Sequence, residues 1–113
     1  MNDVSAAVGL GNLRSLQFIS DGYKRCRDYY NQHLIDVEGV RLIQPDTNNR
    51  DINPWLYSVL VERKQDFYTY MHSRHISVSQ VHERNDKHTC VAQFKAFLPG
   101  LDAIASRLIC LPC

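Results

Sequence analysis

The densest group of side chains that could do chemistry lies in nine residues, Gln80 to His88. This segment carries two histidines, two acids, an arginine, a lysine and an asparagine. Imidazole titrates near neutral pH, and a guanidinium group offers a planar fork to a phosphate or a carboxylate. Such a loop suits the recognition of an anionic or hydroxyl-rich ligand. The competing interpretation is a solvated loop whose charges pair with one another.

A zinc-binding module is a second possibility, because tetrahedral zinc accepts histidine nitrogen and cysteine sulfur. The candidate ligands are His82, His88, Cys90, Cys110 and Cys113. Only the last two cysteines have the short gap that lets a pair bind one ion, and Pro112 lies inside it. Cysteine is also among the most commonly buried residue types for ordinary packing reasons. We therefore predict no metal site.

The first 37 residues, which precede these candidate sites, are expected to be helical. Apolar residues recur at helical spacing from Val4 to Leu13 and again from Ile19 to Val37. Asp3 is a candidate N-cap. Gly9 and Gly11 each cost about 1 kcal/mol against alanine in a helix, which makes sense if another backbone packs closely there. We predict two helices that meet in an elbow near residues 15–18, or one kinked helix.

The remaining residues are expected to form a small sheet flanked by helices, so the fold class is α+β (mixed α/β). Residues 55–61 form the clearest strand, which is expected to be buried on both faces. A polar loop is predicted over 46–53 and an irregular segment over 80–94. Other strands are predicted at 40–43, 76–78 and 109–113, and helices at 64–73 and 101–108. Helical connections between strands permit parallel pairing without requiring it.

The composition excludes several classes of protein. The 113 residues are 44% hydrophobic and 22% charged, which is typical of one globular domain and not of a disordered chain. A net charge of +1 gives no electrostatic basis for binding nucleic acid, and no apolar run is long enough to span a membrane. The start has no signal-peptide pattern, and the four cysteines have no framework spacing. We expect a cytoplasmic protein with reduced thiols.

Four segments resemble one known family. Asp3–Leu13 is similar to the segment that opens a long helix after the cofactor-binding domain in the DegT/StrS family of sugar aminotransferases, and Met1 falls on the methionine of that segment. Pro54–Val59 resembles the central strand of the family's small domain. Arg63–Val78 resembles its next helix and strand, and Leu108–Pro112 resembles its last strand. The resemblance covers nearly the whole chain in the right order, with His75 in place of a usual glycine.

This resemblance implies the small C-terminal domain of a fold-type-I enzyme that depends on pyridoxal phosphate. Residues 1–37 would be the helical linker and residues 38–113 the small α/β domain, truncated at both ends relative to the family. Relatives transfer an amino group from glutamate to a keto sugar carried on a nucleotide, with the cofactor held as a Schiff base on a lysine. The lysines of this chain are Lys24, Lys64, Lys87 and Lys95, and none falls on that position.

The resemblance therefore implies a chain that is inactive alone, binds no pyridoxal phosphate by itself, and offers no assigned catalytic or cofactor-binding residue. Its implied partners are a large domain that binds pyridoxal phosphate, or the other subunit of a homodimer, and a nucleotide-linked sugar. A non-catalytic domain that binds a nucleotide sugar or a partner chain is the alternative.

The loop that follows Val78 corresponds to an active-site loop of the family that reads His-Tyr-Pro-x-Pro-Leu-His. The tyrosine and both prolines are absent here, while His88 falls on the second histidine and His82 lies near the first. The resemblance implies substrate-facing roles in an intact enzyme for His82, Arg84, Asn85 and His88. Arg84 would be available to a phosphate or a carboxylate.

Overall fold

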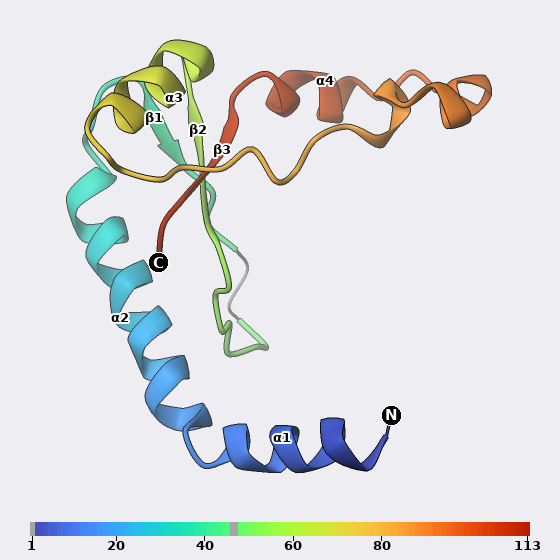
Figure 1. The fold of residues 1–113 in the computed structure, drawn as a ribbon. Coiled ribbons are helices and arrows are strands. Elements are labelled where there is room, and N and C mark those ends of the chain that lie inside the picture. The colour runs from blue at the N-terminus through green and yellow to red at the C-terminus, as the bar shows by residue number, and fades with distance from the viewer. Residues whose placement is uncertain (1, 46–47) are drawn as a thin grey trace.

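The computed structural model describes residues 2–45 and 48–113, so Asp46 and Thr47 of the predicted polar loop lie outside the described residues. Figure 1 shows a small sheet with helices on one side and two projecting segments, which are the N-terminal helix and the arm formed by residues 80–98. The helices are α1 (Asp3–Leu13), α2 (Leu16–Leu34), α3 (Lys64–Ser73) and α4 (Pro99–Ala105), the strands are β1 (Val40–Leu42), β2 (Tyr57–Val61) and β3 (Leu108–Leu111), and two short 3-10 helices are η1 (Asn85–Lys87) and η2 (Thr89–Phe94).

The predicted elbow near the N-terminus is confirmed, one or two residues earlier than expected. α1 ends at Leu13 and α2 begins at Leu16, and Figure 1 shows the two helices meeting at a corner. The cap of α1 differs from the prediction, because the Asn2 side chain accepts a hydrogen bond of 2.8 Å from the Ser5 amide. Asp3 lies in the first turn instead, where its negative charge favours the helix dipole.

The three strands form an antiparallel sheet in the order β1-β2-β3. Val40 pairs with Val61 at one end of β1–β2, and Tyr57 pairs with Leu111 at one end of β2–β3. β2 is therefore the central strand. It begins at Tyr57, two residues later than predicted, and Trp55 before it is 71% exposed. Within β2 the burial on both faces is confirmed, since the side chains of Val59 and Leu60 point to opposite faces and both are buried.

The predicted strand over residues 76–78 is wrong. α3 ends in a turn in which His75 has a φ of +60°, a left-handed conformation that redirects the chain. Beyond this turn Val78 packs into the core, but only Ser79 pairs with a strand, through an isolated bridge to Cys110 with hydrogen bonds of 3.0 and 2.9 Å. The chain then leaves the edge of β3, so no strand develops.

The hydrophobic core is small and lies between the sheet and the helices α2 and α3. Its buried side chains come from β2, β3 and the segment after α3: Tyr57, Val59, Val61, Val78, Ile109 and Leu111. Partly buried side chains of α2 and α3 pack against them, among them Tyr30, Leu34, Phe67 and Met71. No helix within the described residues is both long enough and apolar enough to cross a membrane.

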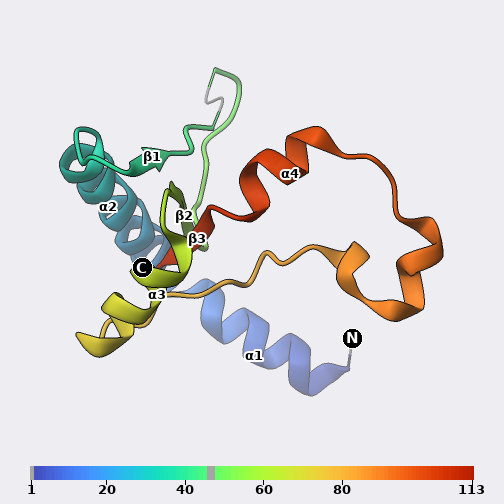
Figure 2. The same cartoon turned by 90° about the horizontal axis from the view of Figure 1, so that it is seen from above.

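Two segments project from this core. The Cα radius of gyration is 17.5 Å, whereas a compact chain of this length has about 13 Å. Figures 1 and 2 show the reason, since α1 runs away from the sheet at one end and the segment with η1 and η2 loops out on another side. The segment returns to the sheet through α4 and β3.

Candidate functional site

The segment with the predicted site residues forms the outer part of one projecting arm. It follows the bridge at Ser79 and contains η1 and η2. His82, Asn85 and His88 are exposed along it, so each could meet a ligand or another chain. These three side chains lie along one projecting segment, and none of them lines the pocket at α2 that is described below.

Arg84 differs from the other predicted residues, because two carboxylates already hold its guanidinium group. Arg84 Nε donates to Asp86 Oδ1 at 2.8 Å, and both terminal nitrogens form ion pairs, one with Asp86 and one with Asp102. The Arg84 side chain is only 13% exposed. These contacts tie η1 to α4. Within this structure Arg84 therefore positions the arm, and its guanidinium is not free to take a phosphate.

The ion pair between Arg84 and Asp86 also shifts the pKa values of both side chains. The hydrogen bond from Arg84 lowers the pKa of the Asp86 carboxyl, and the same bond raises the pKa of Arg84. A carboxyl whose pKa is lower in the folded state stabilises that state above its unfolded pKa. The contribution is lost as the pH falls below about 4.

We expect Arg84→Gln to loosen the arm without unfolding the sheet, because the ion pairs of Arg84 join η1 to α4 and lie outside the core. Hydrogen exchange of amides 85–102 should accelerate, while amides of β2 keep their protection. Arg63→Gln is the matched control, since its ion pair with Asp66 is exposed and local.

The same amides should lose protection in the wild-type chain as the pH falls below about 4. Unchanged exchange in both experiments would contradict a positioning role for Arg84.

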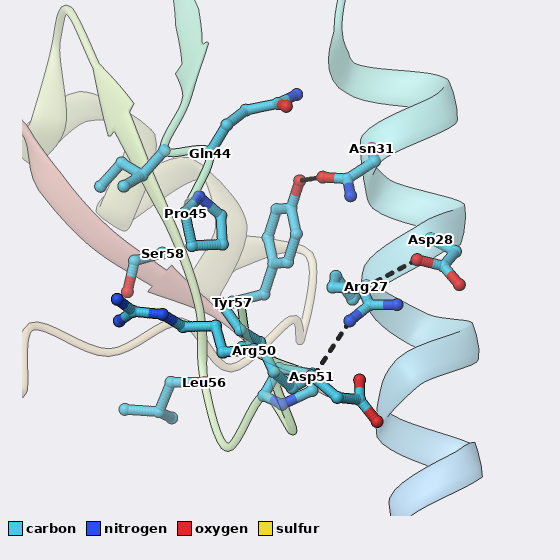
Figure 3. Close-up of a pocket in the computed structure, with 13 residues that line it drawn as sticks. Arg27, Asp28, Asn31, Gln44, Pro45, Arg50, Asp51, Leu56, Tyr57 and Ser58 are labelled. Atoms are coloured by element: carbon cyan, nitrogen blue, oxygen red, sulfur yellow. Dashed lines mark hydrogen bonds and ion pairs between the residues drawn. The ribbon is translucent and has the colours of Figure 1, made fainter. Parts of the chain in front are cut away.

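A second candidate site, not predicted from the sequence, opens between α2 and the connection from β1 to β2 (Figure 3). Its cavity volume is about 520 Å³, within the range of about 300–1,000 Å³ that is typical of small-molecule sites. Eight polar residues contribute to its lining, namely Arg27, Asp28, Asn31, Gln44, Arg50, Asp51, Tyr57 and Ser58.

The pocket exists because β1 and β2 stop pairing early. The last pair of the β1–β2 ladder is Leu42 with Val59, while β2 begins two residues before Val59. Beyond this point the two chains separate, and the connection between them turns towards α2. The edges of Tyr57 and Ser58 that face away from β3 therefore lie at the pocket without a β1 partner.

Hydrogen bonds to α2 fix the walls of the pocket. The Tyr57 hydroxyl donates to Asn31 Oδ1 at 2.6 Å, and burial raises the pKa of that hydroxyl, so it stays protonated at neutral pH. Arg27 Nη1 donates to the Ile52 carbonyl at 3.0 Å, and Arg27 Nε donates to Asp28 at 2.8 Å. Figure 3 shows these contacts on the α2 side, opposite Arg50.

The two candidate sites are separate, since His82, Arg84, Asn85 and His88 are not among the residues that line the pocket. Sequence reasoning missed the pocket because its residues come from α2, from the loop and from β2, and no short motif joins them. The one available signal was the pair Arg50-Asp51 in a polar loop directly before the strongest strand.

The possible metal ligands and the lysines are scattered among the described residues. Between residues 2–45 and 48–113, no three side chains of histidine, cysteine, aspartate or glutamate gather into a group that could hold a metal ion. Lys24 is paired with Asp51 at 2.5 Å, and Lys64 Nζ donates to the Ala105 carbonyl at 3.3 Å. No lysine lines the pocket at α2. The pocket at α2 therefore offers no lysine to hold pyridoxal phosphate covalently.

The chain resembles known aminotransferases in both sequence and fold. A profile of the DegT/DnrJ/EryC1/StrS aminotransferase family matches residues 1–113. The sugar aminotransferase CalS13 from Micromonospora echinospora has a similar crystal structure, with a TM-score of 0.93 and 29% identity over 99% of this chain. AtS13 from Actinomadura melliaura gives a TM-score of 0.94 at 33% identity over 99% of this chain. The aminotransferase TlmJ from Streptoalloteichus hindustanus gives a TM-score of 0.85 at 23% identity, again over 99% of this chain, which shows a shared fold.

The match covers only part of each of these proteins. This chain spans 30% of CalS13, 30% of AtS13 and 31% of TlmJ. A search of curated proteins found no significant match. The predicted fold class is confirmed, with a mixed helical and antiparallel architecture shared with a sugar aminotransferase. Because the family profile matches the chain over its full length, this protein belongs to the DegT/DnrJ/EryC1/StrS aminotransferase family.

Proposed function

We propose that this chain is the small C-terminal domain, with its linking helix, of a pyridoxal-phosphate-dependent nucleotide-sugar aminotransferase. The observation that carries the proposal is the superposition of 99% of the chain on 30% of the sugar aminotransferase CalS13. Cofactor chemistry would then depend on a large domain outside this chain, and the chain alone would be inactive.

The exposure of α1 supports the existence of another domain or subunit that packs against it. Every residue of α1 except the half-buried Ala6 is exposed, and Val4, Val8 and Leu10 are among its exposed apolar side chains. A Cβ added at Gly9 or Gly11 would meet no atom within 4 Å among the described residues. An apolar helix with glycines that nothing approaches is suited to packing against another domain or subunit. A large cofactor-binding domain and a homodimer partner are the proposed occupants.

The proposed substrates are a keto sugar linked to a nucleotide and glutamate as the amino donor, in a cytoplasmic enzyme. In the intact enzyme His82, Asn85 and His88 would face the sugar nucleotide, because they are exposed along one arm. Arg84 would act on the substrate indirectly, by holding that arm against α4 through Asp86 and Asp102. Release of either carboxylate would be needed before Arg84 could contact a phosphate.

Borohydride trapping tests whether the cofactor site lies outside this chain. After incubation with stoichiometric pyridoxal phosphate, we expect no internal aldimine absorbance band. We also expect no single lysine to be labelled after reduction, because Lys24 and Lys87 form ion pairs and Lys64 donates to a backbone carbonyl. Mass spectrometry of the digested chain gives the readout, with an active family member as the positive control. Stoichiometric labelling of one lysine would show that the chain holds the cofactor itself.

A non-catalytic binding role is the second candidate, and the pocket at α2 favours it. This role predicts the same trapping result, so the gene context must separate the two. A reading frame directly upstream that encodes the large domain with its lysine supports the aminotransferase, whereas its absence supports a binding module.

A further inference from the structure

The C-terminal end of the described chain lies against α2 and brings two cysteines together there. Figures 1 and 2 both show this end beside α2. The Pro112 carbonyl oxygen accepts a hydrogen bond from the Tyr30 hydroxyl at 2.7 Å and lies 3.9 Å from Cys26 Sγ. Tyr30 follows Cys26 by four residues, so the two side chains lie on the same face of α2. Cys113, the residue after Pro112, is therefore held next to Cys26.

The thiols of these two cysteines are in direct contact. Partial burial, together with a hydrogen bond to the Cys26 thiol and the charge of that thiol, raises the pKa of the Cys113 thiol to about 11. A hydrogen bond between two thiols requires sulfur atoms that are neighbours. Cys26 is half-buried and Cys113 is exposed, so a small oxidant or reductant in the solvent can reach the pair from the Cys113 side.

The other two cysteines, Cys90 and Cys110, are less favourably placed. Side chains alternate along a strand, and Leu111 points into the core beneath α2, so Cys110 points to the opposite face of the sheet. The Cys110 side chain is buried there, with its sulfur 3.3 Å from a serine hydroxyl of β2. Cys90 lies in η2 on the projecting arm. Cys26 and Cys113 are therefore the pair that the fold selects.

We propose that Cys26 and Cys113 are a disulfide site, which under oxidising conditions forms a reversible cross-link between α2 and the end of β3. The oxidant is a small-molecule disulfide such as oxidised glutathione. One cysteine thiolate attacks a sulfur of the oxidant, and a mixed disulfide forms while one glutathione thiolate leaves. The second cysteine then loses its proton and attacks the mixed disulfide, which releases the second glutathione. Two electrons pass from the cysteines to the oxidant, and their two protons end on the two glutathione thiols.

This cross-link is expected to stabilise the fold and to be easily reversed. It joins distant parts of the chain, since Cys26 and Pro112 are 86 positions apart. Closing so long a loop restricts the unfolded chain, so the oxidised chain should melt at a higher temperature than the reduced chain. The exposed Cys113 leaves the bond accessible to reducing thiols, so it should open in a reducing cytoplasm. The site is formed by this chain alone and does not depend on the aminotransferase assignment.

The test is equilibration of the chain at submicromolar concentration in buffers of reduced and oxidised glutathione, followed by an acid quench. Mass spectrometry of the unreduced peptic digest should show a cross-link between Cys26 and Cys113, with fragmentation before Pro112 separating Cys113 from Cys110. The equilibrium constant for oxidation should be about tenfold or more higher in native buffer than in concentrated urea, because folding raises the effective concentration of the pair. Oxidation should raise the Tm by about 10 °C.

Single substitutions identify the cysteines responsible. Cys26→Ser and Cys113→Ser should each abolish the cross-link and the rise in Tm, whereas Cys90→Ser should leave both unchanged. Circular dichroism of the reduced variants confirms folding, and the comparison with urea uses the wild-type chain and needs no variant. Equal equilibrium constants in native buffer and in urea would overturn the proposal. So would a dominant cross-link through Cys90 or Cys110, or an oxidised chain that melts no higher than the reduced chain, because the native arrangement would then not favour the bond.

Discussion

Ile109→Ala is expected to unfold a large share of the chain in water at 25 °C. The Ile109 side chain is fully buried at the centre of β3, opposite Val59 of β2, which is also fully buried. Truncation of a buried isoleucine costs about 2–5 kcal/mol, because apolar contacts are lost and a cavity is left. Among residues 2–45 and 48–113, only eight hydrophobic side chains are buried. A small core provides little stability beyond the entropy cost of folding, so this loss is a large fraction of the total.

Urea denaturation followed by circular dichroism measures the effect, as a lower midpoint at an unchanged slope. Ile35→Ala is the matched control, since Ile35 is 59% exposed and follows directly after α2. Its midpoint should change little, because surface substitutions usually fall within about 0.5 kcal/mol. A loss of less than about 1 kcal/mol for Ile109→Ala would mean that the sheet is not the stabilising core.

The second large effect expected is self-association of the isolated chain at micromolar concentration. The helix α1 exposes most of its apolar surface, and the corner with α2 adds the exposed Leu16 and Phe18. Contiguous apolar surface of this kind drives association unless another domain covers it. Size-exclusion chromatography with light scattering should give a mass above the 13.1 kDa of one chain.

Replacement of two residues of α1 tests the surface responsible. The double variant Val4→Ser/Leu10→Ser should shift the chain towards monomer, because these side chains are 72% and 67% exposed. The double variant Ile35→Ser/Val37→Ser changes two exposed apolar residues beyond the other end of α2 and should not. A wild-type chain that is monomeric and binds no hydrophobic dye would contradict the proposed docking role of α1.

The helices and the central strands were predictable because their signals are local. The apolar stripe of α2, the glycine at position 39 and the continuous apolar run of β2 each fix an element within a few residues. Gly39 has a φ of +77°, which a glycine adopts without strain, and this supports the turn into β1. Strand direction was not predictable, since it depends on where β3 returns to the sheet after the arm.

The sequence-based predictions were wrong or incomplete where tertiary contacts determine the local structure. Ile76 and Val78 suit a strand, but His75 turns the chain and leaves only the Ser79 bridge. Arg84 is suited to bind a phosphate, but Asp102 lies 18 residues away in sequence and meets it only in the folded arm. The pocket was missed for the same reason, as Asn31 and Tyr57 are 26 residues apart and become neighbours only when α2 packs on the sheet.

The pairing of β2 with β3 has a consequence for biosynthesis. Ser58 and Cys110 are neighbours across the sheet but 52 residues apart in the chain. At about 5–20 residues per second, the ribosome needs roughly 3–10 s to make that stretch. During this interval the apolar residues of β2 have no β3 to cover them, and closing so long a loop slows folding further. The nascent chain therefore exposes an apolar strand segment for seconds. Chaperones that bind emerging polypeptides are expected to bind this segment.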